Sequence, residues 1–191
     1  QVPGGVHTDL LALGCIPDPF VADNELSVQW VAESDWEYQK TFSLEPGLVD
    51  EDRVFLVFDG LDTLADVYLN ENYLGHADNM FRRWEWQVKQ FIQPGENVLR
   101  IVFGAPVRFI REQQAMFALV GGGDIPGGPH LRKAPCHWGW DWGPKLPPIG
   151  VWKDVRLEGR SEARFSNIQV RQQRQRLGRP VAVLDAPKRH Q

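Results

Sequence analysis

The sequence predicts an all-β protein, a jelly-roll β-sandwich that carries a short helical insertion. Several segments of about four to eight residues alternate between apolar and polar side chains, as half-buried strands do. Turn-forming residues separate these segments at nearly regular spacing, which is typical of sandwiches and barrels. Residues 107–119 break the alternation, and their apolar side chains follow a loose helical spacing instead.

The strands are expected between Trp36 and residue 157. In chain order they lie at residues 36–44, 54–58, 65–69, 73–75, 84–88, 98–103 and 151–157. Residues 54–58 are an unbroken apolar run, which indicates a strand covered on both faces. Asn70-Glu71-Asn72 supplies a tight turn, because asparagine tolerates the left-handed conformation. Residues 1–35 are expected to be mostly irregular, with one helical turn near residues 6–11 and a hydrogen-bonded structural histidine, His7.

The chain is expected to divide near residue 160. Residues 1–160 hold the strands of the sandwich. In residues 161–191, Ile168, Val170 and the segment 181–184 are strand-like, but a polar run separates them. This part has too little apolar surface for a core of its own. It therefore reads as a linker and the first strands of a following domain.

Composition narrows the classes of partner. Twenty-one basic and 25 acidic residues give a net charge of −4, which favours neither nucleic acid nor an anionic membrane surface. No apolar run approaches the length of a membrane span. No charged segment followed by an apolar one opens the chain, and the cellular compartment stays open. The two cysteines, Cys15 and Cys136, are either free thiols or one disulfide, and no cofactor motif is present.

The stretch from Cys136 to Pro144 is the strongest candidate for a binding site. It holds three of the eight tryptophans, Trp138, Trp140 and Trp142, with Asp141 between the last two. Indoles offer flat apolar faces, and a carboxylate accepts two hydrogen bonds at once. This combination suits a sugar ring, which has an apolar C–H face and an edge of hydroxyls. The glycines and proline of the stretch predict a loop.

Two other interpretations of this stretch stand beside sugar binding. Core packing is the commoner role of tryptophan, because the residue is highly buried on average. A carboxylate flanked by indoles is nevertheless costly unless a donor pairs with it, and a ligand hydroxyl would be one such donor. Cys136 and His137 are not joined by a second Cys/His pair at a ligand spacing, so no metal site is expected.

Several longer motifs resemble one family. They are Val2-Pro3-Gly4-Gly5-Val6-His7-Thr8-Asp9-Leu10-Leu11, Ile16-Pro17-Asp18-Pro19-Phe20, Trp36-Glu37-Tyr38, Phe58-Asp59-Gly60-Leu61-Asp62-Thr63, Asn79-Met80-Phe81-Arg82 and Arg132-Lys133-Ala134-Pro135-Cys136-His137-Trp138-Gly139-Trp140-Asp141-Trp142-Gly143-Pro144. Together they resemble the N-terminal sugar-binding domain of β-mannosidases in glycoside hydrolase family 2. The resemblance runs from about the first residue to about residue 170.

The resemblance implies a galactose-binding-like jelly roll, followed in a complete enzyme by immunoglobulin-like domains and a (β/α)₈ barrel. The implied reaction is retaining hydrolysis of terminal β-D-mannose from the non-reducing end, by two glutamates on the barrel about 5–5.5 Å apart. A barrel takes about 250 residues, so this chain alone is expected to be inactive and to hold no catalytic residue. The family also has a strand before the Val2–Leu11 motif, so a sheet edge is expected to lack a neighbour.

The resemblance also assigns roles within the site. Asp141 would accept hydrogen bonds from hydroxyls of the terminal mannose, Trp140 would wall the pocket, and Asn79 would also reach the sugar. His137, Trp138 and Trp142 would support the loop from behind. The implied partners are mannosides, manno-oligosaccharides and the remaining domains of the enzyme.

Two further hypotheses remain open at this point: a stand-alone, lectin-like carbohydrate-binding module, and a purely structural domain. The structural reading predicts a buried Asp141 that is paired with a protein cation, whereas the ligand-binding readings predict an exposed one.

Overall fold

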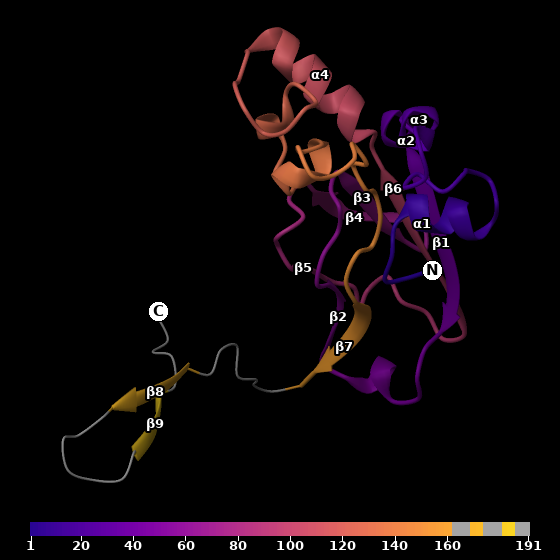
Figure 1. Cartoon of the computed structure of the whole chain (residues 1–191). Coiled ribbons are helices and arrows are strands. Elements are labelled where there is room, and N and C mark those ends of the chain that lie inside the picture. The colour runs from indigo at the N-terminus through magenta and orange to yellow at the C-terminus, as the bar shows by residue number, and fades with distance from the viewer. Residues whose placement is uncertain (162–168, 174–180, 186–191) are drawn as a thin grey trace.

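The computed structural model describes residues 1–161, 169–173 and 181–185, and of residues 171–173 and 181–185 it describes the backbone alone (Figure 1). The strands are β1 (Trp36–Ser43), β2 (Arg53–Phe58), β3 (Ala65–Leu69), β4 (Asn72–Ala77), β5 (Trp84–Gln87), β6 (Glu96–Phe103), β7 (Val155–Arg160), β8 (Gln169–Gln173) and β9 (Val181–Asp185). The helices are α1 (Val6–Ala12), α2 (Asn24–Ser27), α3 (Trp30–Glu33) and α4 (Pro106–Met116), with short 3-10 turns η1 (Leu48–Asp50), η2 (Gly128–His130) and η3 (Pro135–Trp138).

Two antiparallel sheets form the body of the molecule. One has the strand order β1-β6-β3-β4 and the other β5-β2-β7, while β8 and β9 pair with each other. The predicted all-β sandwich is confirmed, and so is the helical insertion, since α4 follows β6 directly. Helix α4 and the loop that carries η2 and η3 gather at one end of the sheets (Figure 1).

The alternation of the sequence accounts for the strands. In β6 every second side chain is buried, and these are Asn97, Leu99, Ile101 and Phe103. In β2, the middle strand of its sheet, Leu56 and Phe58 on one face and Val57 on the other are all buried, which accounts for its unbroken apolar run. Between β3 and β4, Asn70 and Glu71 have φ values of 48° and 66°, as the predicted turn requires.

The core lies between the sheets. Its members are buried apolar side chains from both layers and from the N-terminal segment, among them Val6, Val28, Val31, Phe58, Val67 and Phe103. A second, smaller cluster lies at the helical end and consists of Ala32, Val107, Ile110, Leu131 and Trp138. The second cluster joins helices α3 and α4 to the tryptophan-rich loop.

Some predicted bounds were wrong. The helical turn expected near residues 6–11 is α1, but residues 1–35 are more helical than expected, because α2 and α3 also fall there. Helix α1 is stabilised at its start by the Thr8 hydroxyl, which accepts from the Gly5 N–H and donates to the Gly5 carbonyl. Strand β7 begins at Val155, whereas residue 151 was expected, because Gly150 pairs with Asp62 instead of continuing a sheet. The short helix expected within residues 107–119 is α4, which begins at Pro106 and ends at Met116.

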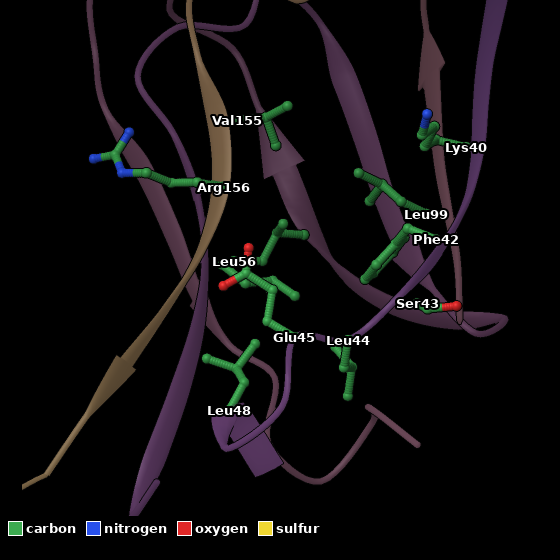
Figure 2. A pocket seen from close by; sticks show the side chains of 11 residues that line it. Lys40, Phe42, Ser43, Leu44, Glu45, Leu48, Leu56, Leu99, Val155 and Arg156 are labelled. Carbon is green, nitrogen blue, oxygen red and sulfur yellow. The ribbon is translucent and has the colours of Figure 1, made fainter. Parts of the chain in front are cut away.

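A groove opens between the two sheets where their outer strands face each other. Within the described ranges, β1 and β7 have one neighbouring strand each. Figure 2 shows that Phe42 and Leu99 on one side and Val155 on the other turn toward this groove, and its volume is about 400 Å³. Inward side chains of β1 and β7 are only half buried, unlike those of β2, β3 and β6. Few polar side chains line the groove, among them Lys40, Glu45 and Arg156.

The hairpin of β8 and β9 corresponds to the strand-like segments expected after residue 160. Residues 162–168, 174–180 and 186–191, which complete the predicted linker and second domain, lie outside the described residues. The division into residues 1–160 and 161–191 therefore stays a prediction.

Candidate carbohydrate-binding turn

Trp140 and Gly143 close a tight turn at the tip of the tryptophan-rich loop. The Gly143 amide donates to the Trp140 carbonyl at 3.0 Å, and the Trp140 amide donates back to the Gly143 carbonyl at 3.2 Å. Asp141 and Trp142 occupy the two central positions of this turn. The side chains of central turn positions point away from the closing hydrogen bonds, so the turn presents both groups outward.

The tip is exposed and aromatic. Trp140 is 38% exposed and Trp142 is 77% exposed, and their ring centroids lie 5.4 Å apart at an angle of 48°. Asp141 is exposed as well, and no ion pair or hydrogen bond joins its carboxylate to another residue of the described ranges. Trp142 was expected behind the loop, but the structure places it on the outer side, where it contacts Trp140 alone among aromatic rings of the described part.

Beneath the tip, Trp138 is fully buried and forms the floor of the loop. Two glycines allow this close packing. A Cβ atom at Gly123 would lie 2.7 Å from the Trp138 Cβ, and one at Gly128 would lie 2.6 Å from the Trp138 ring. The Trp138 carbonyl also accepts hydrogen bonds from the amides of Asp124 and Ile125. The segment before the loop is therefore fastened to its floor.

A buried ion pair lies at the base of the loop, and sequence reasoning missed it. The Lys133 ammonium, whose side chain has no exposed surface, is 2.6 Å from Asp62 Oδ1. It also donates to the Pro148 carbonyl at 2.6 Å. Asp62 is further fixed by the Thr63 hydroxyl and by two backbone hydrogen bonds with Gly150, both of 2.9 Å. No local pattern announces this pair, because its members are 71 residues apart.

Two histidines lie near this pair. Burial, and then the positive charge of Lys133, lower the pKa of His7 to about 4. The same two causes lower the pKa of His137, against the opposing effect of Asp62, whose Oδ2 lies 3.9 Å from His137 Nδ1. The expectation that His7 is hydrogen-bonded was wrong: both its ring nitrogens are buried without a partner among the described residues. His137 is half buried within η3, and its role in supporting the loop stays a prediction.

Asn79 lies beside Arg132, just before the tryptophan-rich loop. It forms a parallel bridge with Arg132, and the Met80 amide donates to the Arg132 carbonyl at 3.0 Å. Its side-chain Oδ1 accepts from the Phe81 amide at 2.9 Å. The side-chain nitrogen of Asn79, Nδ2, has no hydrogen-bond acceptor among the described residues, so it is available to a ligand.

The cysteines are not joined. Cys15 and Cys136 are both exposed free thiols. Across the described ranges, no three His, Cys, Asp or Glu side chains gather where they could hold a metal ion. None of the helices that the structure describes is long and apolar enough to cross a membrane.

The sandwich of two antiparallel sheets is the fold class of a galactose-binding-like domain. The chain belongs to the family of galactose-binding-like domains of glycosyl hydrolase 2, which it matches over residues 1–153.

Its relatives include named enzymes. The chain is 42% identical over 161 residues to beta-mannosidase B of Emericella nidulans and 37% identical over 166 residues to the beta-mannosidase of Capra hircus, with 82% of the chain covered in each. The crystal structure of the beta-D-mannosidase from Dictyoglomus thermophilum matches 93% of the chain at 41% identity, with a TM-score of 0.85. The chain spans only 19% of the two curated relatives and 22% of that structure.

Proposed function

We propose that this chain is the N-terminal domain of a retaining exo-β-mannosidase, which removes terminal β-D-mannose from the non-reducing end of mannosides and manno-oligosaccharides. The domain supplies Asp141 and Trp140 to the pocket for the terminal sugar, and Asn79 adds a polar contact. The two catalytic glutamates lie on a barrel domain outside this chain. The support is the family membership together with three relatives named as β-mannosidases at 37–42% identity.

One observation carries the sugar-binding role: the Asp141 carboxylate is exposed beside the indole of Trp140 and has no partner in the described part of the chain. A carboxylate can accept hydrogen bonds from two neighbouring hydroxyls of a pyranose. Hydrogen bonds to charged groups are worth about 1.5–3 kcal/mol each. Trp140, with 38% of its surface exposed, offers a flat face against the C–H face of the same ring.

The proposed division of labour is tested by an activity assay on this chain. A chromogenic β-mannoside should show no turnover above background, because the acid/base and nucleophile glutamates lie elsewhere. Turnover by the purified chain, lost when Asp141 alone is replaced, would place the chemistry in this domain and contradict the proposal.

A stand-alone carbohydrate-binding module is the second candidate, since the exposed Trp140–Asp141 face would serve a lectin equally well. Titration calorimetry with mannose and manno-oligosaccharides separates the two. A pocket shared with a second domain predicts weak or undetectable binding to this chain. Micromolar binding that is lost in Asp141→Ala and kept in Asp154→Ala, a matched exposed aspartate, would favour the module.

A further inference from the structure

We propose that Lys133 is a positioning residue whose buried ammonium holds together the two stems of the loop that carries Trp140 and Asp141. The loop comprises residues 134–147, so Lys133 directly precedes it and Pro148 directly follows it. The consequence for mannose binding rests on the proposed function, but the positioning itself is a property of this chain.

The contacts place one ammonium at the meeting point of three segments. Lys133 Nζ lies 2.6 Å from Asp62 Oδ1 and 2.6 Å from the Pro148 carbonyl oxygen. Asp62 comes shortly after β2 and is paired through its backbone with Gly150. Lys133 belongs to the first stem, the chain that enters the loop, and Pro148 belongs to the second stem, the chain that leaves it. The ammonium therefore ties the first stem to the second directly, and both stems to the connection between β2 and β3 through Asp62.

The same group lies next to the floor of the loop. Lys133 Nζ is 6.0 Å from the centre of the Trp138 ring, within the range of a cation–π contact. Trp138 in turn precedes Gly139, whose φ of 91° turns the chain outward into the Trp140–Gly143 turn. A displacement of the Lys133 side chain therefore acts on the Trp138 ring, and through Trp138 and Gly139 on the turn that carries Asp141.

Stability alone does not account for a charge at this place. Replacing a buried ion pair by uncharged residues of similar volume is often neutral or stabilising, whereas removing one partner is strongly destabilising. An apolar side chain at residue 133 would fill the space, but it could not donate to the Pro148 carbonyl. What the ammonium adds is a fixed donor that reaches Asp62 and the second stem at once.

Two variants of this chain separate positioning from stability. Lys133→Met removes the ammonium and leaves the Asp62 charge buried, which lowers stability and loosens the loop together. Lys133→Met combined with Asp62→Asn removes both charges and keeps an oxygen that accepts from the Thr63 hydroxyl. This double variant should regain much of the stability of the sheets without regaining the tie to Pro148.

The readout is amide hydrogen exchange, which reports local opening residue by residue. In the double variant, the turn amides of Trp140 and Gly143 should exchange at least about tenfold faster than in the unmodified chain. The exchange rates of sheet amides, such as those of Val57 and Ile101, should stay within about threefold of their rates in the unmodified chain. Lys40→Met, which removes an exposed lysine of β1, should change neither group.

Turn amides that exchange at the original rate in the double variant would overturn the proposal, because the loop would then hold its shape without Lys133. A double variant that does not fold would also overturn it, since Lys133 would then serve the whole fold. The measurement contains no sugar. A failed positioning role therefore leaves the role of Asp141 standing, and a failed role of Asp141 leaves the exchange result standing.

Discussion

The base and the tip of one loop each hold an aspartate, and the two side chains have opposite surroundings. Asp62 at the base is 1% exposed and is bound by the Lys133 ammonium and the Thr63 hydroxyl. Asp141 at the tip is exposed, with no cation against it in the described part of the chain. The difference shows which carboxylate can act on a ligand: that of Asp62 is buried and bound to a cation within the fold, and that of Asp141 is exposed to solvent.

Two tryptophans of the same loop, one at its base and one at its tip, differ in the same way, and they give the largest expected effect on stability. Trp138→Ala should lower the free energy of unfolding by about 4 kcal/mol, because a fully buried indole leaves a cavity in the helical-end cluster. Trp142→Ala, the matched change at the tip, should cost no more than about 0.5 kcal/mol. Urea denaturation followed by circular dichroism measures both. Equal losses would show that base and tip do not differ.

A smaller effect is expected from pH, through His7, a half-buried histidine near the base of the loop. His7 has a pKa of about 4 in the folded chain, and an unfolded histidine has one of about 6.5. Between these values the unfolded state binds more protons, so the stability present above pH 6.5 is lost as the pH falls toward 4. From pH 7 to pH 5 the loss assigned to His7 is about 2 kcal/mol.

The check on this effect is urea denaturation at both pH values. His7→Gln should reduce the pH dependence, while His76→Gln, a change at an exposed histidine, is the matched control. His137 contributes in the same direction, because its pKa is also lowered. A pH dependence that survives His7→Gln in full would contradict the assignment.

The smallest expected effect concerns the stability of the tip itself. Asp141→Asn should change the free energy of unfolding by less than about 0.5 kcal/mol, because the carboxylate has no protein partner in the described ranges to lose. Thermal unfolding monitored by circular dichroism measures the difference. A clear stabilisation or destabilisation would reveal a structural role for Asp141 and weaken the contrast with Asp62.

Most strands were predictable because their side chains alternate with a period of two, and β2 was predictable from its unbroken apolar run. The helices α2 and α3 were not, since four-residue helices carry little periodicity. Val28, Val31 and Ala32 nevertheless have the spacing of one helical face, and all three are buried. That spacing was the signal that could have found the helical character of this segment.

The loop was predictable from its glycines and proline, but its interior was not. The residue types of the Cys136–Pro144 stretch indicated a sugar-binding loop, yet they did not say which indole lies inside. That choice depends on η3 and on the positive φ of Gly139, which send Trp138 inward and Trp142 outward. The pair of Asp62 and Lys133 was beyond reach, because only the folded chain brings these two residues together.

We propose that the exposed Asp141 binds the substrate sugar, while the base of the loop only holds Asp141 in place. The most direct test replaces the corresponding domain of the Dictyoglomus thermophilum β-D-mannosidase with residues 1–160 of this chain and measures kcat/KM for a chromogenic β-mannoside. Asp141→Ala should lower kcat/KM at least about a hundredfold, from the loss of two charged hydrogen bonds, while Asp154→Ala leaves it unchanged. An Asp141→Ala chimera as active as its unsubstituted counterpart would contradict the claim.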